Sequence, residues 1–133
     1  MKTRKAFFAV LTLVIFVFLQ TPVMNAKDLV TRPFHISGQI TFFYDGSIMD
    51  QGVATHLGKF DCFGTWSSGT YFAANGDELY WEVEGYMTYT IIFTGGTGKF
   101  ENATGGYAFE LVQIPGPEGG MTFAYKGTGT ITY

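Results

Sequence analysis

Residues 94–107 constrain the fold of this chain more than any other stretch. They read Thr-Gly-Gly-Thr-Gly-Lys-Phe-Glu-Asn-Ala-Thr-Gly-Gly-Tyr and separate two aromatic, β-branched runs, 89–93 and 107–112. Five glycines permit backbone conformations with positive φ that other residues adopt only at a cost. The stretch predicts two strands joined by a tight corner, with an apolar side chain as its plug. The residues of this predicted corner are Gly95, Gly96, Gly98, Phe100 and Gly105.

The N-terminus has the pattern of a secretory signal peptide. Three basic residues within the first five positions precede an uncharged apolar run, 6–19, which is short for a transmembrane helix. A more polar stretch follows and ends in a small-residue cleavage site at 24–26. We therefore expect residues 1–26 to be a signal peptide and the protein to be exported, to the periplasm or the medium. An uncleaved membrane anchor is the alternative.

The remaining residues, 27–133, have the length of a single domain with one core. Five basic residues stand against eleven acidic ones there, a net charge of −6 with histidine neutral. This balance argues against a nucleic-acid partner and against binding to anionic membranes. After removal of the signal peptide we expect no stable membrane insertion. We also expect no cofactor.

Apolar residues alternate with polar ones along most of the chain after residue 27, as in half-buried strands. One face of the stretch 34–44 is apolar, and a second alternation follows at 79–84. We expect a turn at Gly69 and a strand over 86–94. Seven or eight short strands at this spacing are typical of a sandwich or barrel. We predict an all-β fold, a small antiparallel eight-stranded barrel of the calycin-like kind, because closure removes exposed strand edges.

Three stretches in the same order resemble a known family. They are Gly52-Val53-Ala54-Thr55-His56-Leu57-Gly58-Lys59-Phe60, then 73–79, then the glycine corner from Thr94 to Gly105. Together they resemble small exported bacterial proteins whose barrel is similar to plant allene oxide cyclases and dirigent proteins. The resemblance implies a barrel with a hydrophobic cavity and a homo-oligomer. The plant proteins steer cyclisation or coupling of apolar substrates in such cavities.

Only two residues are candidates for catalysis. His56 shares its parity with Phe60 and Cys62, so we expect it to face inward, where a group titrating near neutrality could act as a base. Cys62 is the single cysteine, and a buried apolar role competes with a catalytic one. No spacing of histidine, cysteine and carboxylate residues predicts a metal site. The glycine corner lacks the spacing of a phosphate-binding loop.

Aromatic residues are 18% of the chain, and for each of them a place in the core is the alternative to a place in a pocket. A surplus over the needs of the core would line an apolar pocket. Our candidates for ligand-binding residues are Trp66, Trp81, Tyr89 and Phe109.

Two functions follow from this pattern. The first is a non-catalytic module that binds a small apolar ligand or a protein partner. The second is an isomerase or cyclase acting on an apolar substrate in the barrel, by resemblance alone. Adjacent polar groups pointing inward would favour the enzyme, and their absence would favour the binder. A third interpretation is a miniature outer-membrane barrel, which would require Trp81 to lie in a girdle of aromatic residues that face the lipid.

Overall fold

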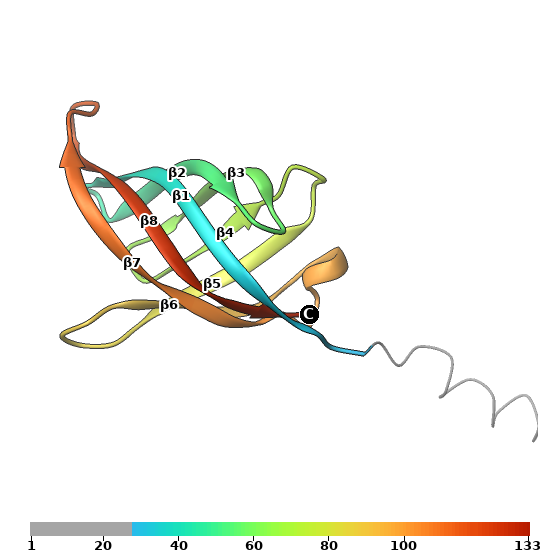
Figure 1. Ribbon diagram of the computed structural model, residues 1–133. Helices are drawn as coiled ribbons and strands as arrows, with labels where there is room; N and C mark the ends of the chain where they lie inside the picture. The colour runs from blue at the N-terminus through green and yellow to red at the C-terminus, as the bar shows by residue number, and fades with distance from the viewer. Residues whose placement is uncertain (1–27) are drawn as a thin grey trace, which may run out of the picture.

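The protein is a closed β-barrel. The computed structural model describes residues 28–133, so the predicted signal peptide, 1–26, lies outside the described residues. Each strand pairs antiparallel with the next in sequence, and the last closes onto the first (Figure 1). The prediction of an all-β, eight-stranded antiparallel barrel is confirmed. The strands are β1 Thr31–Phe43, β2 Ser47–Ala54, β3 Gly58–Thr65, β4 Ser68–Phe72, β5 Glu78–Glu84, β6 Thr90–Gly96, β7 Thr104–Ile114 and β8 Gly120–Thr132.

The alternation in the sequence separates the inside of the barrel from the outside. Along β5, Leu79 and Trp81 are buried while Tyr80 and Glu82 are exposed. This follows from the two-residue period of a strand, which sends successive side chains to opposite faces. Trp81 lies inside the barrel and forms no part of an outward girdle.

The two ends of the barrel differ. The connections β2–β3, β4–β5 and β6–β7 meet at one end together with both termini of the barrel domain (Figure 1). The side chains of Leu57 and Phe100 are buried there, and the rings of Phe100 and Tyr133 pack edge to face with centroids 5.3 Å apart. We call this the plugged end. The other four connections, at the opposite end, surround the mouth of the barrel.

The glycine corner forms the plug between β6 and β7. Residues Gly98–Phe100 make one turn of 3₁₀ helix, η1, and Phe100 is fully buried. Gly98 has φ +57, and its Cα lies so close to Asp77 that an added Cβ would be 2.1 Å from the carboxylate. Asp77 Oδ2 also accepts a hydrogen bond of 3.3 Å from the backbone N–H of Lys99. The corner therefore holds Phe100 in place through backbone contacts.

Two boundaries differ from the sequence-based expectations. Gly69 lies within β4 opposite Gly64, and the β3–β4 turn lies before it, at residues 66–67. Glycine is needed at 69 for close approach, because an added Cβ would be 2.6 Å from the Trp81 indole. The expected strand over 86–94 begins only at Thr90. Residues 85–89 instead form a loop at the mouth.

The wall of the barrel extends least far towards the mouth beside this loop. Strand β6 pairs with β7 over three positions, of which Thr90 opposite Ala108 is the last towards the mouth. Beyond Ala108, β7 pairs only with β8, which β1 covers on its other side up to Phe43, so the end of β7 is an open edge of the wall (Figure 1). The mouth therefore opens to one side as well as at the end. The described part contains no helix long and apolar enough to span a membrane.

Candidate functional site

A cavity of about 350 Å³ occupies the mouth half of the barrel. Seven of the twelve lining residues are aromatic and one is acidic. The four candidate ligand-binding residues all lie on its wall, although they come from four different segments. The lining residues are Ile40, Phe42, Asp50, Trp66, Trp81, Val83, Tyr89, Ile91, Tyr107, Phe109, Leu111 and Tyr125.

The cavity is open to solvent at the mouth. Trp66, in the β3–β4 turn, and Tyr89, in the loop before β6, are 51% and 56% exposed while lining the cavity. Leu111, in the part of β7 without a β6 neighbour, is also exposed. An open apolar pocket of this size is within the range of small-molecule sites.

Asp50 carries the one carboxyl group among the residues that line the cavity. It lies on β2 next to Cys62 of β3 and is 2% exposed. The hydroxyl of Tyr125 donates a hydrogen bond of 2.7 Å to its Oδ2 atom. Its other oxygen, Oδ1, is buried and has no hydrogen-bond partner among the described residues. The cavity wall thus carries a carboxyl group with one unpartnered oxygen among the described residues.

Burial shifts the titration of this carboxyl group strongly. Desolvation raises the pKa of Asp50 to about 7, although the hydrogen bond from Tyr125 and the nearby backbone N–H of Gln51 act in the opposite direction. Desolvation disfavours the charged form, and no positive charge lines the cavity to compensate. Asp50 therefore changes its charge close to neutral pH.

Further polar groups lie close to Asp50. The hydroxyls of Tyr71 and Tyr107 are hydrogen-bonded to each other, and the indole N–H of Trp81 donates to Cys62 Sγ at 3.2 Å. Burial raises the pKa of the Tyr71, Tyr107 and Tyr125 hydroxyls, so they stay protonated donors. Adjacent polar groups therefore do point into the barrel, as expected for an enzyme, but Asp50 is the one group of this set that changes its charge near neutral pH, so they supply a single group for proton transfer.

The two residues that the sequence offered for catalysis take other positions. His56 lies in the β2–β3 turn at the plugged end with φ 69, and its ring nitrogens contact the Pro33 carbonyl at 3.0 Å and the Tyr133 hydroxyl at 2.9 Å. It does not line the cavity. Cys62 is buried inside the barrel, where desolvation raises the pKa of its thiol, so it is a poor nucleophile.

Sequence reasoning missed Asp50, and a signal for it was present. Ile48, Asp50 and Gly52 share one parity on β2, and Ile48 is a buried core residue. A single carboxylate on the apolar face of a strand is unusual and points to a functional group. The alternation in 47–54 is too short to define a separate strand from the sequence alone.

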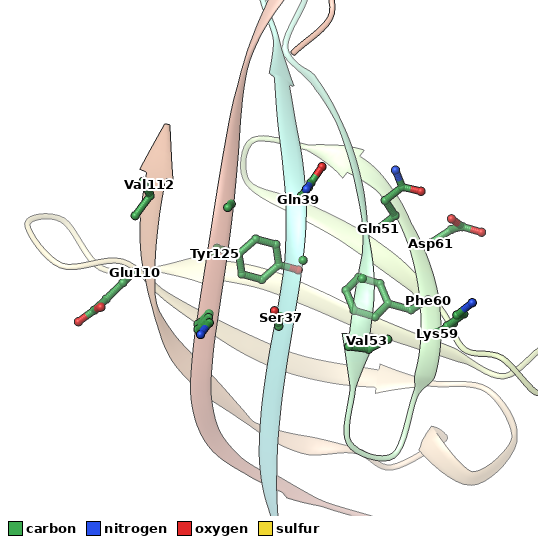
Figure 2. Close-up of a pocket in the computed structure, with 14 residues that line it drawn as sticks. Ser37, Gln39, Gln51, Val53, Lys59, Phe60, Asp61, Glu110, Val112 and Tyr125 are labelled. Atoms are coloured by element: carbon green, nitrogen blue, oxygen red, sulfur yellow. The ribbon is translucent and has the colours of Figure 1, made fainter. Parts of the chain in front are cut away.

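A second hollow lies on the outer wall, across β7, β8, β1, β2 and β3 (Figure 2). Outward side chains of both charges line it, among them Lys59, Asp61 and Glu110. Phe60 and Tyr125 belong to the interior but contribute to its floor, since the glycines of β1 and β2 leave the wall thin. It is a wide, shallow surface without convergent polar groups, so the interior cavity is the better candidate site.

The chemistry available in the cavity is that of one carboxyl group among aromatic rings. Among residues 28–133, no group of three or more histidine, cysteine or acidic side chains is placed to hold a metal ion. The Asp50 carboxylate can accept a hydrogen bond or pair with a positive charge, and as a carboxylic acid it can donate a proton.

Comparison with known proteins assigns no function to this cavity. The resemblance to allene oxide cyclases and dirigent proteins stays a prediction from the sequence. No protein-family model, no curated protein and no solved structure matches the chain.

Proposed function

We propose that the protein binds a small, largely apolar molecule inside its barrel and holds it without changing it. The observation that carries this function is the open cavity of about 350 Å³, lined mostly by aromatic rings. The plugged end is filled by Phe100 and its neighbours, so a ligand would enter at the mouth. Burial of the apolar surface of the ligand against these rings would supply most of the affinity.

Export and membership of the family of barrels similar to allene oxide cyclases and dirigent proteins belong to the same proposal. Export is supported by the charge and apolar pattern of residues 1–26. The family is supported by the glycine corner from Thr94 to Gly105 and the two stretches before it. An exported acidic barrel would suit the capture of a sparingly soluble molecule outside the cytoplasm.

Native mass spectrometry of the protein purified from its own host tests the binding function. A small molecule that leaves on denaturation and is recovered unchanged after incubation is the expected result. A protein without ligand that also fails to take up apolar probes, such as 1-naphthalenemethanol, would refute binding in the cavity. The function would then lie on the outer surface, in contacts with a protein partner.

An isomerase is the second candidate, and the inward Asp50–Tyr125 pair favours it. The carboxylate would take a proton from a C–H beside a carbonyl and return it to another carbon of the same molecule. The double bond moves, and no atoms or electrons are gained or lost overall. A general base works best when its pKa lies near the working pH, which Asp50 satisfies.

Conversion of 3-cyclohexenone to 2-cyclohexenone, followed by ultraviolet absorbance, tests this second candidate. An enzyme of this type would accelerate the reaction, and Asp50→Asn would remove the acceleration. Equal rates with the wild-type protein and the variant would leave binding as the only function of the cavity.

A further inference from the structure

Asp50 places an unpartnered carboxyl oxygen in the wall of the cavity. A buried carboxylate with one unused oxygen is costly unless a donor or a positive charge reaches it. Asp50 Oδ1 is in this situation. The Asp50 side chain is only 2% exposed and lies in the wall of the cavity. A ligand that brings a positive charge to Oδ1 would gain a charge-assisted hydrogen bond, which is stronger than a neutral one.

The rest of the cavity wall also suits a cation. Aromatic faces attract ammonium groups through their quadrupoles, most strongly when water is excluded. Trp66, Trp81 and Tyr89 line the cavity together with four further aromatic residues. No lysine, arginine or histidine is among the lining residues. A cation would therefore meet attractive groups and no repulsive one.

The charges around the mouth favour the same ligand. Acidic residues occupy the connections and strand ends there: Asp45 in the β1–β2 turn, Glu84 at the end of β5 and Glu118 in the β7–β8 turn. The basic residues of the described part are Arg32, Lys59, Lys99 and Lys126, on the plugged half or midway along β8. A mouth with charges of one sign raises the local concentration of ligands of the opposite sign.

We propose that the ligand of the cavity is a lipophilic amine, bound as its ammonium ion, for which the Asp50 side chain turns its buried Oδ1 atom toward the cavity. This inference rests on the proposed binding function and names the ligand class for that site. The apolar part of the amine packs against the aromatic walls, and the ammonium group replaces the missing partner of the carboxylate.

The titratable groups around Asp50 are consistent with this assignment. Tyr125 of β8, Cys62 of β3, Tyr71 of β4 and Tyr107 of β7 surround the carboxyl group, and all four keep their protons at neutral pH. Asp50 is thus the group that titrates near neutrality in this set. An ammonium ligand needs the ionised form, so binding is expected to weaken as the pH falls.

Three naphthalene probes of matched size test the inference: 1-naphthylmethylammonium, neutral 1-naphthalenemethanol and anionic 1-naphthoate. At about pH 8 we expect the wild-type protein purified from its own host to bind the ammonium at least ten-fold more tightly than the alcohol, an order-of-magnitude figure equal to about one pKa unit of free energy. We expect the naphthoate to bind most weakly. From about pH 8 to pH 5 the affinity for the ammonium should fall by about two orders of magnitude, because the probe stays charged while Asp50 becomes protonated.

Asp50→Asn should remove the preference for the ammonium over the alcohol and most of its pH dependence. Asp61→Asn is the matched control, because it removes the same charge from an exposed position on the outer side of β3 and should keep the preference. If both variants lost the preference for the ammonium equally, the preference would arise from the net charge of the protein, and the inference would be overturned. Should Asp50→Asn fail to fold, the pH profile of the wild-type protein decides, and a flat profile for the ammonium overturns the inference.

The probes also separate this inference from the proposed function. Binding of the alcohol as tightly as the ammonium would refute the amine assignment and leave an apolar-ligand module in place. Absence of binding for all three probes would refute the cavity as a binding site and the amine with it.

Discussion

The Tyr125 hydroxyl donates a hydrogen bond of 2.7 Å to Asp50 Oδ2, linking residues that lie 75 positions apart in the sequence. They come from β8 and β2, which are not neighbours, because β1 lies between them. Gly38 of β1 makes the contact possible, since an added Cβ would lie 3.0 Å from the hydroxyl and 3.1 Å from Asp50 Oδ1. Three strands are thus fitted around one buried carboxyl group.

Stability of the protein is expected to depend on the pH through Asp50. Its pKa is raised from 3.8 to about 7 in the barrel. The folded state therefore binds more protons than the unfolded chain between about pH 4 and pH 7. Stability is highest below the pKa of the unfolded chain and is lost as the pH rises through the pKa in the barrel. The difference between the two pKa values corresponds to about 4 kcal/mol of unfolding free energy. Asp50→Asn should therefore reduce the change in unfolding free energy between pH 4 and pH 8, measured by urea unfolding, by a few kcal/mol.

Asp61→Asn is the control for this profile as well. Asp61 is exposed on the outer side of β3, so its replacement should leave the slope of the profile unchanged. A slope that survives in Asp50→Asn would show that the carboxyl group is not desolvated in solution.

Removal of the Tyr125 hydroxyl should raise the free-energy cost of burying the ionised Asp50 carboxylate. The hydroxyl lowers the pKa of Asp50 against the larger effect of burial, so Tyr125→Phe is expected to raise that pKa above 7. At about pH 8 the variant should lose about 1.5–3 kcal/mol of unfolding free energy, the cost of a lost hydrogen bond to a charged group. The loss should be smaller at about pH 4, where the carboxyl group is protonated.

Tyr80→Phe provides the comparison for Tyr125→Phe. The Tyr80 hydroxyl donates to Glu78 Oε2 at 3.2 Å on the exposed side of β5. An exposed bond of this kind contributes little, so urea unfolding should detect a change below about 0.5 kcal/mol. Equal effects of the two substitutions would contradict the assignment of Tyr125 as the partner of a buried charge.

Much of the barrel could be predicted from local patterns. The alternation of Leu79, Trp81 and Val83 with polar neighbours predicts a strand from its own residues alone. Such a strand can be recognised without knowing which residues lie next to it in the fold. The turn at residues 75–77 has the Asn-Gly-Asp sequence that is typical of tight turns, and Gly76 has φ +90 there. The expectation for Gly69 failed because the same residue serves close packing as well as turns, and the Trp81 indole that requires it is distant in sequence.

The candidate site could be predicted only in part. The aromatic surplus identified Trp66, Trp81, Tyr89 and Phe109, which the fold brings to one cavity. The parity argument for His56 failed because the alternation of β2 and β3 is interrupted by the turn that contains it. Asp50 stands out in the sequence as a carboxylate on an apolar strand face, but its hydrogen bond to Tyr125 across an intervening strand needs the strand register.

The plug at the closed end should carry a large share of the stability. Phe100 is fully buried, so Phe100→Ala is expected to cost about 3–5 kcal/mol of unfolding free energy through lost burial and the remaining cavity. Phe63→Ala is the matched control, because Phe63 is 52% exposed on the outer wall. Urea unfolding of both variants decides, and a cost at Phe100 no larger than that at Phe63 would contradict the role of Phe100 as a plug.

The corner that holds this plug should tolerate no side chain at Gly98. Gly98 and Gly76 both have positive φ, so an alanine at either position costs about 1–2 kcal/mol in the backbone. At Gly76 an added Cβ meets nothing within 4 Å, whereas at Gly98 it would lie 2.1 Å from Asp77 Oδ1. Gly98→Ala should therefore cost at least about 1 kcal/mol more than Gly76→Ala in urea unfolding, because Asp77 must give up a hydrogen bond. Equal costs would mean that Asp77 moves freely.

Access to the cavity should depend on Leu111 and not on its neighbour. Leu111 lines the cavity where β7 has no β6 partner, and Val112 points to the outer side of the same strand. An indole in place of Leu111 would fill part of a space of about 350 Å³, so Leu111→Trp should weaken binding of 1-naphthalenemethanol at least about ten-fold. Val112→Trp adds the same side chain on the opposite face and should bind the probe as the wild-type protein does. Fluorescence titration measures both, and equal affinities of the two variants would place the probe outside the barrel.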